Sequence, residues 1–371
     1  MIGGVSSAVQ AARSVRVVDA SAWPADRWDA LAARSEHGEA FQSHAWGESK
    51  AVLGWRPLRI VVERDGQAIG AVSLQERSLG ARLRGPFGRL TYLYAPRGPV
   101  LLHRDPEAAR AVLDALARLA RARHAVALTV DPAWEEGSDL AAALSESGFR
   151  PAAREIQVSR TAMLVPLEAD ESAQHEQLGD STARNVNKAR RAGVVTERVD
   201  LSGRESAAEA LDAFWEMFVA TGRREGFIVR DREYQLGQWL ALGEAGLASL
   251  WFGRVAGTRR NGVVLLHSGR RLVSHVAGSA DDADLRRTRA NHLLQWEIMR
   301  WGADHGFETY DLGGVDTQDA PGLPADRSHP LWNLYEFKQG FGARGVVFVR
   351  AHDVSPHAAL AAGWSLARRL R

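Results

Sequence analysis

One order of predicted elements occurs twice along the chain, and this repeat constrains the fold more than any other feature. A hairpin, a strand, a helix and a further strand are predicted between residues 59 and 132, and again between residues 249 and 314. The first helix begins near residue 106, where Asp105 can cap it and Pro106 suits its first turn. The two hairpin sequences, RDGQAIGAVSL and VAGTRRNGVVLL, also look alike. We therefore predict an internal duplication of one α/β unit.

The length of 371 residues exceeds what one typical hydrophobic core organises, which also favours two domains. Strand, loop, helix and strand form the core of the acetyltransferase-like (GNAT-like) fold. The predicted fold class is therefore α/β, more narrowly α+β, with two tandem acetyltransferase-like domains and no coiled-coil arm. We place the first domain at residues 1–153 and the second at residues 154–345, and we expect residues 346–371 to pack back on the first.

Neither copy has a glycine-rich loop leading into its helix. In acetyltransferases, backbone N–H groups at this place bind the pyrophosphate of coenzyme A, and glycines allow the close approach. The second copy reads RRTRANHLL, with His292 where a small residue would help, and the first reads APRGPVLLHRDPEAARAV. These sequences argue against coenzyme A as a substrate.

Composition excludes several kinds of site. The chain has no cysteine, which rules out disulfides, thiolate metal sites and a cysteine nucleophile. Its twelve histidines show no metal-ligand spacing, so we predict no metal site.

No apolar run approaches the roughly 20 residues of a membrane span, and the start MIGGVSSAVQAARS does not resemble a signal peptide. We therefore expect a soluble, cytoplasmic protein.

The formal net charge is only +2, so global charge gives little reason to expect a nucleic-acid partner. One local stretch differs. The sequence RNVNKARR contains Arg184, Lys188, Arg190 and Arg191. Such a run is either a solvated helix face with local ion pairs or a surface that meets tRNA phosphates or an anionic membrane.

A lysine lies among aromatic and glycine residues near the C-terminus, in LYEFKQGFGARG at residues 334–345. Lysine is rarely buried without a partner. The segment by itself permits two interpretations. In one, it is a strand and turn whose Lys338 points into water, and in the other, Lys338 is a functional cation.

Several segments in order resemble the FemABX family, the aminoacyl transferases that act on peptidoglycan precursors. These segments are FQSHAWGESKAVLGW, YAPRGPV, RNVNKARRAGV, TGRREGFIVR, NHLLQWEIMRWGADHGFETYDLGGV and LYEFKQGFG, and they extend from about residue 41 to about residue 350. Each segment alone is weakly specific, whereas the ordered set is specific. The resemblance implies two tandem acetyltransferase-like domains with a cleft between them.

The resemblance also implies an enzyme and its reaction. Aminoacyl-tRNA would donate an amino acid through its ester to a side-chain amine on the peptide of a peptidoglycan precursor, which builds the interpeptide bridge. An ester is already activated, so the attack needs no protein nucleophile, and we expect no cofactor besides the tRNA co-substrate. The acceptor would be nucleotide-linked or lipid-linked, and the lipid-linked form would bring the protein to the inner face of the membrane. We expect a monomer.

The resemblance assigns roles to residues in the matching motifs. Lys338 would stabilise charge that develops on the ester oxyanion or the ribose oxygen, and Phe337 would shape the acceptor or adenosine end of the site. Lys50 would contact the diphosphate of the precursor. Arg224 or Arg230 would supply the second phosphate contact, since arginine donates two parallel hydrogen bonds. A surface position without a ligand is the alternative for Lys50 and for each arginine.

Residues near predicted strand ends are further candidates. Asp131 ends the last strand of the first copy, and it would orient the attacking ammonium or take its proton, or else belongs to a turn before proline. Asp311, at the same place in the second copy, more simply caps a turn with the glycines that follow. Tyr335 is a candidate for stacking on a base or sugar, with core packing as the alternative.

Two other functions fit the same sequence. The fold would suit an N-acyltransferase that uses acyl-coenzyme A or acts on a different amine, although the missing glycine loops disfavour coenzyme A. The second alternative is a non-catalytic protein that binds RNA or a membrane surface through its basic stretches. In that case Lys338 would be dispensable, and mutation of the four cations between residues 184 and 191 would remove all activity.

Overall fold

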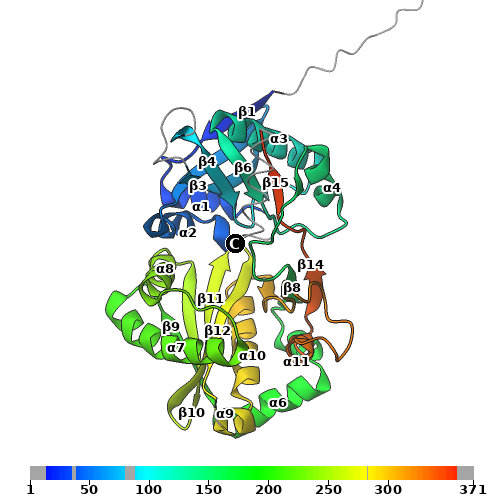
Figure 1. The fold of residues 1–371 in the computed structure, drawn as a ribbon. Helices are drawn as coiled ribbons and strands as arrows, with labels where there is room; N and C mark the ends of the chain where they lie inside the picture. The colour runs from blue at the N-terminus through cyan, green and yellow to red at the C-terminus, as the bar shows by residue number, and fades with distance from the viewer. Residues whose placement is uncertain (1–13, 36–38, 80–87, 282, 357–371) are drawn as a thin grey trace, which may run out of the picture.

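The computed structural model describes residues 14–35, 39–79, 88–281 and 283–356, and these form two α/β halves stacked on one another (Figure 1). Each half is built on one mixed sheet. The first sheet has the strand order β1-β2-β3-β4-β6-β15-β7, with β5 paired to β3. The second has the order β14-β8-β13-β12-β11-β10-β9.

The elements have the following bounds. The strands of the first sheet are β1 (Val15–Asp19), β2 (Arg56–Arg64), β3 (Gln67–Ser78), β4 (Thr91–Ala95), β5 (Val100–Leu101), β6 (Ala125–Val130), β7 (Arg150–Pro151) and β15 (His352–Val354). Those of the second sheet are β8 (Thr161–Pro166), β9 (Val195–Asp200), β10 (Ala248–Val255), β11 (Thr258–Ser268), β12 (Arg271–Ser279), β13 (Thr309–Asp311) and β14 (Arg344–Val347). The helices are α1 (Ala25–Ala32), η1 (Ala40–Gln42), α2 (His44–Ser49), η2 (Ala51–Leu53), α3 (Pro106–Ala122), α4 (Asp139–Glu146), α5 (Glu171–Glu176), α6 (Asp180–Arg191), α7 (Arg204–Glu225), α8 (Arg232–Glu244), α9 (Ala283–Thr288), α10 (Ala290–Asp304) and α11 (Trp332–Gln339).

The two sheets share one arrangement, so the predicted duplication is confirmed. In each, a meander of antiparallel strands leads to one parallel pair, β4 with β6 in the first sheet and β12 with β13 in the second. A crossover helix connects the strands of each pair, α3 in the first half and α10 in the second. This is the predicted fold class of two tandem acetyltransferase-like units.

Each parallel pair is flanked by a strand from elsewhere in the chain. Strand β8, which follows the first half in sequence, lies antiparallel to β13. Strand β15, near the end of the chain, returns to lie antiparallel to β6, and Figure 1 shows it in red inside the blue and cyan half. Two segments therefore join the halves. Residues 357–371 of the segment expected to return to the first domain lie outside the described residues.

Helix α3 shows how the local sequence sets these elements. As predicted, Asp105 caps it: the carboxylate accepts hydrogen bonds from the backbone N–H groups of Glu107 (3.0 Å) and Ala108 (3.1 Å). Its apolar residues recur at helical spacing, and Val112 and Leu116 are buried in the core of the first half. The cap fixes where the helix begins, and the apolar stripe fixes which face meets the sheet.

The sequence of residues 15–58 predicts mostly helix, but this prediction is wrong at its start, where Val15–Asp19 forms β1. This strand lies at the edge of the sheet, and most of its side chains are exposed. Because neither face of this strand is consistently buried, the sequence VRVVD does not show the alternation of apolar and polar residues that marks a half-buried strand. Its pairing with β2, in which Val17 lies opposite Val62, determines its structure instead.

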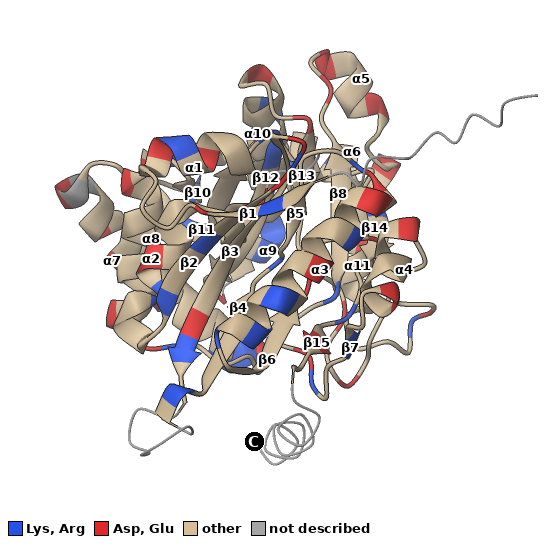
Figure 2. Ribbon diagram, turned by 90° about the horizontal axis from the view of Figure 1, so that it is seen from above, with Lys and Arg blue, Asp and Glu red and all other residues tan. Residues whose placement is uncertain are grey.

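Charge is distributed without a large region of one sign in the view from above, where basic and acidic positions are interspersed (Figure 2). This agrees with the net charge of +2. Electrostatic effects therefore depend on local arrangements. Within the described part of the chain, no helix combines the length and the apolar character needed to cross a bilayer.

Candidate active site

Lys338 is buried where helix α11 meets the end of strand β13. The interpretation of a solvent-facing lysine on a strand is wrong. Residues 332–339 form a helix, which suits their lack of β-branched residues, and Lys338 is only 7% exposed. Its Nζ donates a hydrogen bond to the carbonyl oxygen of Gly314, 2.7 Å away. Burial lowers the pKa of Lys338 to about 8, and the charge of Asp311 opposes this shift. An ammonium has three donors, so Lys338 can also donate to an incoming oxyanion.

Asp311 connects Lys338 to a second buried cation. One Asp311 oxygen accepts a hydrogen bond from the backbone N–H of Gly313 at 2.8 Å, which confirms the predicted turn cap. The other oxygen forms an ion pair with Arg271, at the start of β12. Both side chains of this pair are buried. The loss of either partner would leave an uncompensated charge inside the protein.

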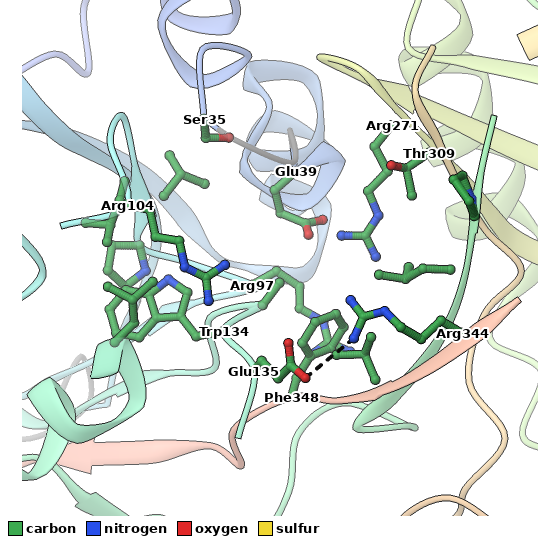
Figure 3. Close-up of a pocket in the computed structure, with 18 of the residues that line it drawn as sticks. Ser35, Glu39, Arg97, Arg104, Trp134, Glu135, Arg271, Thr309, Arg344 and Phe348 are labelled. Carbon is green, nitrogen blue, oxygen red and sulfur yellow. Dashed lines mark ion pairs between the residues drawn. The ribbon is translucent and has the colours of Figure 1, made fainter. Parts of the chain in front are cut away.

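A pocket of about 500 Å³ lies between the two halves, with Arg271 in its wall (Figure 3). The first half contributes the turn between β4 and β5 and the segment before α4, and the second contributes β8, β13 and β14. The charged residues that line it are Glu39, Arg97, Arg104, Glu135, Arg271 and Arg344. Its apolar wall includes Trp134, Leu140, Leu164 and Phe348. Several guanidinium groups around one pocket suit a ligand with carboxylate or phosphate groups.

Glu39 is a buried carboxylate of this pocket, and only 8% of the residue is exposed. Burial raises the pKa of Glu39, while the charges of Arg271 and Arg97 act in the opposite direction. In Figure 3 its carboxylate points toward Arg271. Together with Asp311 and Lys338, these side chains form a row of alternating charge that crosses from the second half into the first.

Asp131 lies directly after β6, beside the turn that carries Arg97. Its buried carboxylate accepts hydrogen bonds from the Tyr94 hydroxyl (2.7 Å) and from the backbone N–H of Arg97 (2.5 Å). Burial raises the pKa of Asp131 to about 6. The Arg97 guanidinium in turn donates to the carbonyl of Ser159 at 2.9 Å. Asp131 therefore holds a turn that lines the pocket, and its contact with a substrate amine stays a prediction.

Lys50 lies at the boundary between the halves, where α2 meets α8 (Figure 1). Its Nζ donates to the Tyr234 hydroxyl at 2.6 Å and lies 4.1 Å from the centre of the Trp46 ring. Burial lowers the pKa of Lys50 to about 7, and the charge of Arg230 adds to this effect. His275 packs edge-on against Trp46, and burial lowers the pKa of His275 to about 4, so it is neutral at pH 7. A bound anion would relieve the repulsion between the cations, so this place suits a phosphate.

Of the two arginines considered with Lys50, Arg230 is the one whose charge adds to the lowering of the Lys50 pKa. Arg224, in the last turn of α7, instead forms an ion pair with Glu225 and donates to the Ser279 hydroxyl at 3.0 Å. The diphosphate role of Lys50 and of either arginine stays a prediction.

Phe337 and Tyr335 pack against the core of the second half. The Phe337 ring meets His292 with 5.0 Å between ring centres and Phe341 with 5.2 Å. The Tyr335 hydroxyl accepts a hydrogen bond from the Gln339 side chain at 2.7 Å. Both aromatic residues are half-buried, and their contact with a substrate stays a prediction.

The predicted basic stretch forms helix α6, and its cations separate into two groups. Arg184, Lys188 and Arg191 are exposed, and their spacing places them along one face of the helix. In the part of the chain that the structure describes, no ion pair involves any of these three. Arg190, by contrast, pairs with Glu297 at 3.2 Å. The interpretation as a face held by ion pairs therefore applies to Arg190, and the other three form an unpaired basic stripe.

Sequence reasoning missed Glu39, Arg97, Arg271 and Arg344, which come from separate segments and line the pocket. It also missed Tyr234, which contacts Lys50. A signal existed for Arg97, since it lies in YAPRGPV, one of the segments that carry the family resemblance.

Comparison with known proteins tests the resemblance directly. The model of the FemAB family matches residues 24–235, and that of the acetyltransferase (GNAT) domain matches residues 180–321. The chain is 25% identical to the lipid II:glycine glycyltransferase of Staphylococcus aureus (strain MRSA252), over an alignment of 391 residues that covers 85% of this chain and 87% of that protein.

Solved structures support the same fold. The crystal structure of FemX has a TM-score of 0.75 and 22% identity, and the match covers 92% of this chain and 98% of FemX. The structure of L-PGS from Bacillus licheniformis has a TM-score of 0.52 and 11% identity, covering 94% of this chain and 96% of that one. Because the FemAB model spans more than half of the residues, the predicted resemblance is confirmed: the chain belongs to the FemAB family.

Proposed function

We propose that this protein transfers an amino acid from aminoacyl-tRNA to a side-chain amine of a peptidoglycan precursor and thereby builds an interpeptide bridge. Membership of the FemAB family supports this reaction class. The name of the similar Staphylococcus aureus protein, a lipid II:glycine glycyltransferase, supports a peptidoglycan precursor as the acceptor. The structural observation that carries the proposal is the buried Lys338 ammonium, which Asp311 and Arg271 connect to a pocket between the halves.

This reaction needs stabilisation of charge rather than a nucleophile from the protein. The acceptor amine attacks the ester carbonyl and a C–N bond forms. The ester C–O bond then breaks, the nitrogen releases a proton, and the ribose oxygen leaves and takes up a proton in its place. Negative charge develops first on the carbonyl oxygen and then on the ribose oxygen. A fixed ammonium in a buried site stabilises such charge more strongly than water does, and this is the role of Lys338 in the proposal.

The charged groups along the boundary suit an acceptor of this class. A precursor peptide carries carboxylates, which match the guanidinium groups of the pocket. It also carries the amine that reacts, and the buried carboxylate of Glu39 suits that amine in its charged form. Lys50 and Arg230 suit the diphosphate. A single copy of the chain supplies all these residues. The reaction takes place in the cytoplasm, because the aminoacyl-tRNA donor is found there.

A transfer assay with purified protein tests the proposal. Charged total tRNA is combined with either the nucleotide-linked or the lipid-linked pentapeptide precursor, and the products are measured by mass spectrometry. We expect the acceptor to gain the mass of one amino-acid residue, only when the tRNA is charged, and that mass identifies the amino acid. Acylation of another amine that requires acyl-coenzyme A, without any gain from charged tRNA, would contradict the proposal and favour an N-acyltransferase.

Replacement of Lys50 by Met or of Arg230 by Gln is expected to raise the KM for the acceptor about 10- to 100-fold, with a smaller effect on kcat. A charge-assisted hydrogen bond contributes about 1.5–3 kcal/mol, and a contact remote from the reacting atoms acts on substrate and transition state alike. Initial rates at varied acceptor concentration measure both constants. Arg224→Gln is the comparison, because Arg224 already has a carboxylate partner. An equal rise in KM for Arg224→Gln, with none for Arg230→Gln, would move the role to Arg224.

Combined replacement of Arg184, Lys188 and Arg191 by Ala is expected to weaken binding of aminoacyl-tRNA and to flatten its salt dependence. Each lost phosphate contact reduces the slope of log K against log salt concentration by about 0.7–0.9. Filter binding of tRNA between low and moderate salt measures this slope. Arg190→Ala is the matched control, since Arg190 is paired with Glu297. An unchanged slope in the triple variant would place the tRNA on another surface.

A further inference from the structure

Exposed apolar side chains lie close in sequence to Lys50 and to Arg230, whose charge acts on Lys50. Val52 follows Lys50 by two residues and is 77% exposed, and Ile228 precedes Arg230 by two residues and is 92% exposed. Each half of the molecule thus presents one exposed aliphatic side chain beside one cation. With their exposed neighbours they form an apolar rim, which consists of Val52, Leu53, Phe227 and Ile228. Single exposed apolar residues are common, but two groups of them, each next to a cation in sequence, need an explanation.

The first side of the rim is the short turn η2. None of its three residues, Ala51–Leu53, is buried, so the turn contributes nothing to the core. Its position is nevertheless fixed, because the Arg77 guanidinium donates a hydrogen bond to the carbonyl oxygen of Leu53. The same guanidinium lies over the ring of Trp55, 4.6 Å from its centre. Tryptophan and arginine beside exposed aliphatic residues are typical of a surface at the boundary between water and lipid.

The second side of the rim is the loop between α7 and α8. The Phe227 ring packs against Phe218, with 5.4 Å between ring centres. Val229 packs so closely on Gly222 that a Cβ atom there would lie 2.6 Å from it. Ile228 therefore lies between two neighbours that are held in place, and its exposure is set by the fold of the loop.

Direct contacts join the elements that adjoin the two sides of the rim in sequence. The Lys50 ammonium donates to the Tyr234 hydroxyl at 2.6 Å, and the Gln238 side chain donates to the Ser49 hydroxyl at 2.9 Å. Both bonds join α2 of the first half to α8 of the second, and Figure 1 shows these helices facing each other across the boundary. The two sides of the apolar rim therefore adjoin, in sequence, the two elements that meet at Lys50.

We infer that the apolar rim is a membrane-contact surface, which enters the headgroup region of an anionic lipid bilayer so that the acceptor reaches the protein in its lipid-linked form. The inference rests on the proposed function, in which Lys50 and Arg230 bind the diphosphate of the acceptor. A lipid-linked diphosphate has its charges at headgroup level and its chain in the hydrocarbon. Cations bordered by apolar side chains match that order, and the cations also attract anionic lipids. A nucleotide-linked acceptor has no apolar chain and would leave the rim in water.

Vesicle binding of the full chain tests the surface without any substrate. Cosedimentation with vesicles of phosphatidylcholine and phosphatidylglycerol is compared for the parent protein and Val52→Ser/Ile228→Ser. We expect the partition coefficient of the double variant to fall about tenfold or more, because two branched aliphatic side chains no longer enter the bilayer. Val15→Ser/Val195→Ser is the matched control, since both valines are exposed on the edge strands β1 and β9. A parent protein that does not bind vesicles, or an equal loss in both double variants, would overturn the inference.

Transfer rates on the two acceptors separate this inference from the proposed function. Val52→Ser/Ile228→Ser should lose activity on the lipid-linked acceptor in vesicles and keep the parent rate on the nucleotide-linked one. Its unfolding temperature should match that of the parent, since both side chains are exposed. Equal rates of variant and parent on the vesicle-borne acceptor would overturn the inference and leave the proposed function intact. No transfer by the parent to either acceptor would contradict the proposed function, whereas the vesicle binding would still report on the surface.

Discussion

Replacement of Lys338 by Met is expected to lower kcat for aminoacyl transfer by about 10²- to 10³-fold without lowering the unfolding temperature. The loss of activity follows from removing a preorganised donor to the developing oxyanion, for which this range is usual. The stability follows from burial: a pKa lowered from 10.5 to about 8 means that the site disfavours the charged form by about 3 kcal/mol. A Met side chain of similar length fills the space without that cost, which compensates for the lost hydrogen bond to Gly314.

The pH dependence of the same residue has a definite sign. Lys338 stabilises negative charge only when protonated, so kcat should decline as the pH rises through about 8. Stability should change in the opposite direction. Between about pH 8 and pH 10.5 the unfolded chain holds a proton on this lysine that the folded chain has lost, so the free energy of unfolding rises with pH there. The free energy of unfolding of Lys338→Met should not show this rise with pH.

Steady-state kinetics and thermal unfolding of the same preparation measure both effects. Glu336→Ala is the control variant, because Glu336 is exposed on the same helix, two residues from Lys338. It should match the parent in rate and in unfolding temperature. A structural lysine would behave differently, since Lys338→Met would then lower the unfolding temperature and the rate together. Full activity in Lys338→Met would remove Lys338 from the reaction.

Sequence reasoning was most successful where local patterns carry the information. The duplication was predicted because two stretches repeat the same alternation of strand and helix periods, and the Asp105 cap was predicted from the residue types at one helix start. Lys50 and Lys338 were identified because they lie in segments that resemble a family. The FemAB match confirms that resemblance for the chain, and it leaves the role of each lysine to experiment.

The pocket was not predictable in the same way. Glu39 and Arg271 are more than 200 residues apart in sequence, and neither belongs to a local pattern that marks it as buried. One of the two interpretations of residues 334–345 was a strand and turn, which their aromatic residues favour, but Phe337 belongs to helix α11 and finds its packing partners on the core of the second half. In both cases tertiary contacts outweighed the local preference.

Replacement of Asp311 by Asn is expected to lower the free energy of unfolding by about 3–5 kcal/mol, because it leaves the Arg271 guanidinium buried without a counter-charge. The amide oxygen of Asn can still accept the hydrogen bond from Gly313, so the turn itself is preserved. Urea unfolding of the parent and the variant measures the difference. Glu308→Gln is the matched control. The Arg270–Glu308 ion pair lies close to the Arg271–Asp311 pair in sequence but is exposed. Its loss should therefore lower the free energy of unfolding by less than about 1 kcal/mol.

Two further measurements distinguish a lost charge from a general disturbance of packing. The double variant Arg271→Met/Asp311→Asn should be more stable than Asp311→Asn alone, because it removes the uncompensated charge as well as its partner. In Asp311→Asn itself, the decline of kcat at high pH should begin below pH 8, since Asp311 is the charge that raises the pKa of Lys338 against burial. A double variant no more stable than the single one would show that the unpaired Arg271 charge is not what destabilises Asp311→Asn. An unmoved pH profile would show that Asp311 does not set the state of the Lys338 ammonium.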